Sequence, residues 1–180
     1  MPHLALSALG RDHPGIVAGV TGVLVGRRVN VEDSRMAILR GEFAMVLVLG
    51  APHHLDLGTL ERDLDRVRDE LGLEALTLTE IAEDLAADGS PPTHIVSVYG
   101  ADHPGIVHAV TSALAEREVN IADLTTRLVD DPGGEPLYAM ALEVTLPGTL
   151  DLSDLDGALA TVAADQGVEV SLRALERDVL

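Results

Sequence analysis

The chain has 180 residues, of which 47% are hydrophobic but only 2% aromatic, and it carries 30 acidic against 12 basic residues, a formal net charge of −18. All the basic residues are Arg and no Cys occurs, which excludes a Schiff-base or P-loop lysine, thiolate nucleophiles and Cys-based metal sites. The acidity predicts a solvated surface that repels nucleic acid, so we expect no direct nucleic-acid binding.

No apolar run approaches the roughly 20 residues that cross a bilayer, and the N-terminus lacks a basic segment ahead of an apolar stretch. We therefore expect a cytoplasmic protein without membrane contact.

The first predicted elements are a short strand and an amphipathic helix. Leu4–Leu9 is an apolar run, and Ile16, Val17, Val20 and Leu24 then follow at helical spacing. Pro14 suits the first turn of this helix, and Asp12 just before it is expected to accept hydrogen bonds from the free amides.

Two further strands, a helix and a last strand complete the pattern. Val29–Leu39 and Phe43–Leu49 read as a hairpin around Arg40-Gly41, and Leu73–Ile81 reads as the last strand. Between them one apolar stripe marks an otherwise charged helix; it consists of Leu57, Leu60, Leu64, Val67 and Leu71.

The same pattern occurs twice. The segments 10–33 and 100–123 are identical at 14 of 24 positions, and the match continues after a five-residue insertion near Asp130–Gly134. We therefore predict a first domain at 1–82, an acidic, proline-terminated linker at 83–92 and a second domain at 93–180. Two βαββαβ units of this length predict an α+β fold of two ferredoxin-like domains, with another two-layer sandwich as the alternative.

The most informative motif is D-H-P-G-I-V, at Asp12–Val17 and again at Asp102–Val107, between the first strand and the first helix of each copy. A helix N-terminus exposes unsatisfied N–H groups that favour a carboxylate or phosphate, and glycine lets a ligand approach. Asn30 and Asn120, at the start of the next strand, offer donors and an acceptor suited to an amino acid. The alternative is structural: a capping Asp, a helix-starting Pro, a packing Gly and a turn Asn.

D-H-P-G-I-V followed about fifteen residues later by V-N-V or V-N-I resembles the start of an ACT domain. The resemblance implies two domains side by side in one eight-stranded antiparallel sheet with helices on one face, and an amino acid bound between them. It places the ligand contacts on twelve residues: Asp12, His13, Pro14, Gly15, Ile16, Asn30, Asp102, His103, Pro104, Gly105, Ile106 and Asn120. Two such domains also resemble the glycine cleavage system transcriptional repressor family.

We therefore expect a non-catalytic regulatory protein without cofactor or metal, which senses a small amino acid of the glycine or serine type. Its expected partner is a protein such as a transcription factor or an enzyme, and a homo-oligomer is possible. The alternatives are a module that binds no ligand and a regulatory subunit of a metabolic enzyme; formyltetrahydrofolate deformylases also carry an ACT-like region. The two sites are expected to differ, because Arg11 and Ala18 in the first copy become Ala101 and His108 in the second.

Overall fold

The computed structural model describes residues 3–81, 91–129 and 137–175. The chain divides into two compact units, Met1–Asp88 and Gly89–Leu180, each of which has its own fold. The predicted linker at 83–92 falls almost wholly outside the described residues, so the exact domain limits stay a prediction.

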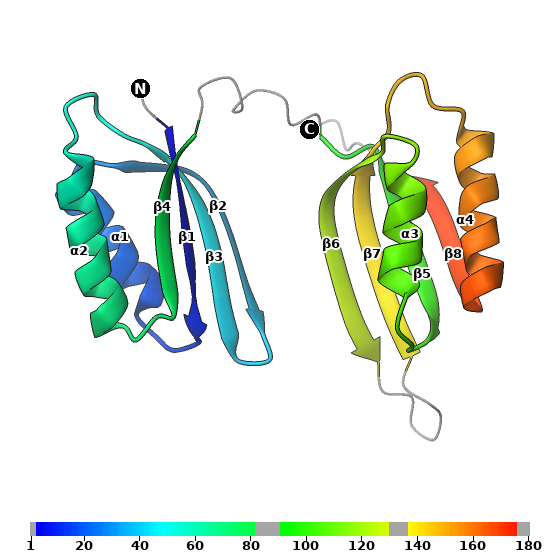
Figure 1. The fold of residues 1–180 in the computed structure, drawn as a ribbon, viewed down its shortest axis with the longest axis horizontal. Coiled ribbons are helices and arrows are strands. Elements are labelled where there is room, and N and C mark those ends of the chain that lie inside the picture. Colours follow the sequence, from blue (N-terminus) through cyan, green and yellow to red (C-terminus); the bar gives the residue numbers. More distant parts are fainter. Residues whose placement is uncertain (1–2, 82–90, 130–136, 176–180) are drawn as a thin grey trace. The chain divides into compact units, whose positions relative to one another are not determined.

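Each unit contains four strands and two helices in the order βαββαβ (Figure 1). The elements of the first unit are β1 His3–Arg11, α1 Ile16–Gly26, β2 Asn30–Leu39, β3 Glu42–Gly50, α2 Leu57–Glu70 and β4 Ala75–Ile81. Those of the second are β5 His94–Ala101, α3 Ile106–Ala115, β6 Asn120–Val129, β7 Leu137–Thr145, α4 Leu152–Gln166 and β8 Val168–Ala174.

The sheets are antiparallel, with strand orders β2-β3-β1-β4 and β6-β7-β5-β8. This is the ferredoxin-like arrangement that the doubled pattern predicts, so the fold prediction is confirmed for each unit. The expected joining of both sheets into one of eight strands concerns the placement of the units and stays a prediction.

In each unit both helices cover one face of the sheet (Figure 1). Alternate residues of β1 and β3 face the helices and are buried, as a sheet with one covered face requires. The first core is apolar throughout and includes Leu6, Ile16, Phe43 and Leu60. The second is built from the equivalent positions, with Tyr138 where the first has Phe43.

Two details of the second strands bear on the site. The hairpin between β2 and β3 turns on Arg40 and Gly41, both at positive φ (53° and 88°), as a two-residue loop requires. Near the start of β2 the register with β3 shifts between Val31 and Asp33, which leaves Glu32 unpaired as a bulge. β6 has the same shift between Ile121 and Asp123.

Within the described ranges no helix is long and apolar enough to span a membrane.

Candidate functional site

The D-H-P-G motif forms the connection between the first strand and first helix of each unit. Asp12 donates its backbone N–H to the carbonyl of Gly41 at 2.8 Å, so it prolongs the end of the sheet. α1 then begins at Ile16, with Gly15 as its N-cap at φ 103° and ψ −14°. In the second unit Gly105 takes the same place at φ 110° and ψ −20°.

This geometry corrects two predictions about the helix start. No side chain caps α1 or α3, so Asp12 and Asp102 do not act as N-caps, and Pro14 lies in the turn before the helix instead of in its first turn. A Cβ on Gly15 would meet no atom within 4 Å, so the glycine is required by the left-handed backbone and not by close packing. The first N–H groups of both helices therefore lack a side-chain acceptor.

The histidines of the motif tie this loop to the end of the second helix of the same unit. His13 lies with Nε2 2.8 Å from the carbonyl oxygen of Leu71, at the end of α2, and Nδ1 3.0 Å from that of Pro14. His103 repeats the arrangement with Gln166 at 2.8 Å and Pro104 at 3.1 Å. A neutral imidazole has one N–H, so only the protonated ring donates to both carbonyls.

These carbonyls raise the pKa of both rings above its ordinary value. For His13 the carbonyl of Pro14 has the largest effect, followed by that of Leu71; for His103 the order is Gln166 and then Pro104. The neighbouring carboxylates of Asp12 and Asp102 raise the pKa further, while desolvation opposes the change. In the protonated form, therefore, both ring nitrogens of each histidine hold the loop by donating to backbone carbonyls.

The asparagines lie at the other end of each sheet from the D-H-P-G loop. Asn30 pairs with Gly50, which also pairs with His3 at the start of β1, whereas the loop follows Arg11 at the end of β1. Eight residue steps along β1 separate these ends by roughly 27 Å. Asn120 is placed in the same way, opposite Thr145. Figure 1 shows the start of β2 and the end of β1 at opposite ends of the sheet. Within one unit, a single amino acid does not reach both.

The other predicted residues come together as one loop in each unit. Asp12, Asp102 and both glycines are exposed, whereas the side chains of Ile16 and Ile106 are buried in the cores with exposed fractions of 1% and 2%. The isoleucines can therefore offer a ligand only their backbone N–H groups. Arg11 lies on the face of β1 that points away from the helices, opposite Glu42, so the difference from Ala101 does not bear on the helix side of the loop.

In the second unit the loop borders a hollow of about 530 Å³ on the helix side. Its walls come from the motif, from α3 and from the second residue of the strand β7. They are formed by Asp102, His103, Pro104, Gly105, Ile106, Val107, His108, Thr111 and Tyr138. Sequence reasoning missed Tyr138 and Thr111 as lining residues. The sequence did contain one indication of Tyr138, because it replaces Phe43 at the matching position of the second core.

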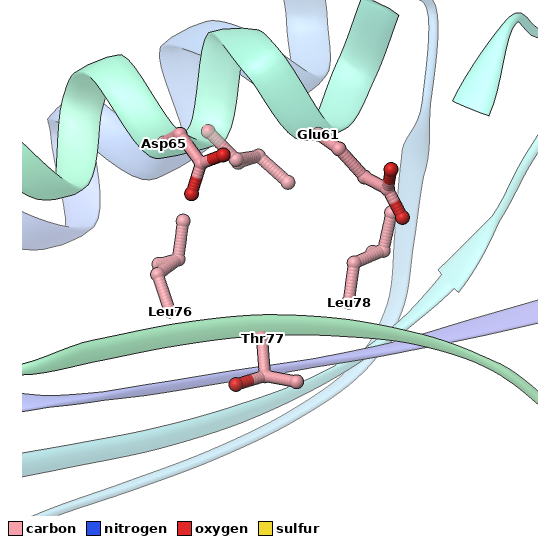
Figure 2. A pocket seen from close by; sticks show the side chains of 6 residues that line it. Glu61, Asp65, Leu76, Thr77 and Leu78 are labelled. Carbon is pink, nitrogen blue, oxygen red and sulfur yellow. The ribbon is translucent and has the colours of Figure 1, made fainter. Parts of the chain in front are cut away.

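A separate hollow of about 250 Å³ lies in the first unit between α2 and β4. Figure 2 shows Glu61 and Asp65 on the helix above Leu76 and Leu78 of the strand, while Thr77 points away from the helix. Its polar side chains on the helix are carboxylates, which repel the carboxylate of an amino acid. This hollow therefore suits the predicted ligand less well than the D-H-P-G loop does.

Among the described residues, no three His, Asp or Glu side chains gather in a way that could hold a metal ion.

Comparison with known proteins identifies the class. Two family models described as ACT domain match residues 3–77 and 94–145, which together make up most of the chain. The chain therefore belongs to the ACT domain family and carries two such domains in tandem.

Individual relatives extend this result over the full length. The chain is 25% identical to the glycine cleavage system transcriptional repressor of Escherichia coli K12, over 96% of this chain and 90% of that protein. A crystal structure of an unknown protein from Galdieria sulphuraria is 28% identical, with a TM-score of 0.80 over 97% of this chain and 99% of that one. A phosphoserine phosphatase of Streptomyces coelicolor is 29% identical over 97% of this chain, but the match spans only 40% of the phosphatase. The chain is thus an ACT-domain regulatory protein related to a transcriptional repressor.

Proposed function

We propose that this protein is a non-catalytic, cytoplasmic sensor that binds a small amino acid of the glycine or serine type and acts on a protein partner such as a transcriptional regulator. The observation that carries the proposal is the repeated loop in which a left-handed glycine begins a helix without a side-chain cap. Similarity to a glycine cleavage system transcriptional repressor supports the kind of partner.

The chemistry of the loop suits a zwitterion. The uncapped N–H groups and the positive end of the helix dipole favour the ligand carboxylate. Asp12 and Asp102, exposed in the same loops, offer a negative charge to the ligand ammonium group. Neither interaction needs a cofactor or a metal ion.

Direct binding to nucleic acid is no part of the proposal. The chain has 18 more acidic than basic residues, and binding to nucleic acid depends on cations that neutralise phosphates. A transcriptional effect would therefore pass through a protein partner.

A small amino acid is expected to raise the melting temperature of the protein. At about 100 times Kd, one occupied site adds about 2.7 kcal/mol to the free energy of unfolding, which for a chain of this size is a shift of roughly 5–10 °C. Differential scanning fluorimetry against the twenty amino acids at millimolar concentration measures it. A screen in which no amino acid shifts the melting temperature by more than about 1 °C would favour a module that binds no ligand.

The assignment of Asn30 and Asn120 to the ligand stays a prediction with its own test. If each asparagine hydrogen bonds the ligand, Asn30→Ala and Asn120→Ala raise Kd by roughly 5- to 150-fold without unfolding the protein, because both side chains are exposed. Titration calorimetry on the two variants measures the change. If both variants bind with the parental Kd, the asparagines do not contact the ligand, and the predicted site is limited to the D-H-P-G loops.

A second candidate function is a regulatory subunit of a metabolic enzyme, and the similarity to part of a phosphoserine phosphatase favours it. Both functions share the amino acid ligand and differ in the partner. Affinity capture with and without the amino acid, followed by mass spectrometry, distinguishes a transcription factor from an enzyme.

A further inference from the structure

The two loops have the same backbone, but the surfaces beside them differ at two matching positions. The third residue of the helix is Ala18 in α1 and His108 in α3, and the second residue of the following hairpin strand is Phe43 in β3 and Tyr138 in β7. Both changes add hydrogen-bonding groups to the second unit at the border of its hollow.

The polar side chains that line this hollow differ in whether their hydrogen-bonding groups already have partners within the protein. The hydroxyl of Thr111 donates to the carbonyl of Val107 at 2.9 Å, so its proton is engaged inside the helix. The Nδ1 atom of His108 lies 3.4 Å from the hydroxyl of Ser112, and within the described part of the chain no hydrogen bond engages its Nε2 atom. His108 therefore has a ring nitrogen free to meet a ligand.

Tyr138 contributes a second group from the floor of the hollow. Its side chain is buried, with an exposed fraction of 9%, and its hydroxyl donates to the sulfur of Met140 at 3.7 Å. A thioether is a weak acceptor, so a ligand oxygen is a better partner for this proton. Burial and the nearby Asp102 carboxylate raise the pKa of Tyr138 above its ordinary value, which keeps its proton in place, and a hydrogen bond with the Thr126 side chain partly opposes this rise.

We infer that the second unit selects an amino acid with a side-chain hydroxyl, serine or threonine, whereas the first unit binds small amino acids without regard to the side chain. The inference rests on the proposed function, because it concerns the ligand of the same loop. A hydroxyl donates and accepts, so it matches His108 in either tautomer and accepts from Tyr138. A side-chain carboxylate is disfavoured by Asp102 in the same wall.

The test follows the amides of Gly15 and Gly105 by NMR in the labelled full-length chain during titration with glycine, L-alanine, L-serine and L-aspartate. At Gly105 we expect serine to bind about tenfold more tightly than alanine, the effect of one good hydrogen bond. At Gly15 we expect a ratio near one. His108→Ala should bring the ratio at Gly105 close to one, and Tyr138→Phe should lower it.

A gain-of-function variant is a control, because misfolding could explain a lost serine preference in His108→Ala or Tyr138→Phe but could not create a new preference. Ala18→His places an imidazole at the matching exposed position of α1, and it should give Gly15 a preference for serine over alanine. If no amino acid shifts either glycine, the proposed function fails. If amino acids shift Gly105 but serine and alanine bind equally, or aspartate binds more tightly than serine, the proposed function stands and the selectivity inference is overturned.

Discussion

Alanine in place of Gly105 is expected to lower the free energy of unfolding of the second unit by about 1–2 kcal/mol, the cost of a left-handed backbone in a residue with a Cβ. Gly105 has φ 110°, and the added Cβ would lie 3.4 Å from Oε1 of Gln166, which is a tolerable contact. The cost therefore comes from the backbone. A backbone that relaxes toward negative φ turns the first N–H groups of α3 away from the loop, so amino-acid binding there should weaken at least tenfold.

Gly157→Ala is the matched control for this variant. Gly157 lies inside α4 of the same unit, and a Cβ there meets no atom within 4 Å. Alanine should raise the free energy of unfolding by about 0.5–1 kcal/mol and leave binding unchanged. Urea denaturation followed by NMR signals of the second unit measures stability, and calorimetry measures binding. Full stability and parental Kd in Gly105→Ala would contradict the role given to the left-handed turn.

The two motif histidines are expected to make the protein less stable as the pH rises from about 6 to 8. Their pKa in the folded protein lies above the ordinary value of about 6.5 because carbonyl oxygens accept from both ring nitrogens. A group whose pKa is higher in the folded state stabilises the protein fully below its unfolded pKa, and this stabilisation is lost as the pH passes the folded value. The loss should affect both units, since each has its own histidine.

The variant His13→Gln/His103→Gln is expected to remove this part of the pH dependence, because glutamine does not titrate. Melting temperatures of parent and variant between pH 5.5 and 8.5 should converge at the alkaline end, where the parental rings are neutral. His53→Gln/His54→Gln is the control, since both histidines are exposed in the loop between β3 and α2. Equal pH profiles in the parent and the motif variant would show that the two carbonyl contacts do not depend on the proton.

The fold follows from the sequence because the repeat shows every element twice. The apolar alternation of β1 and β3 and the leucine stripe of α2 gave bounds within a few residues of those observed. The helix start was misread because Asp followed by Pro and Gly fits a common capping pattern. In the structure Asp12 instead donates its backbone N–H to Gly41, a contact between residues distant in the chain, and Gly15 is the N-cap.

The site was predicted in part. The resemblance to an ACT domain grouped Asn30 with the motif, yet an eleven-residue helix that returns along the sheet carries the next strand to the opposite end. The order of the elements already contained this result. The histidine contacts were beyond sequence reasoning, because their acceptors are backbone carbonyls of Leu71 and Gln166, 58 and 63 residues away. Any residue type can supply a backbone carbonyl, so the identity of residues 71 and 166 does not indicate that they accept these hydrogen bonds.

The bulges of β2 and β6 separate each asparagine from the rest of its strand. Asn30 lies opposite Gly50 and Asp33 opposite Val48, so the alternation of side chains along the strand shifts by one residue at Glu32. Deleting Glu32 would force one alternation on the whole strand and turn either Asn30 or the residues after it onto the other face. The bulge therefore works as a phase shift, which sets the face of the sheet on which Asn30 lies relative to the residues after Glu32.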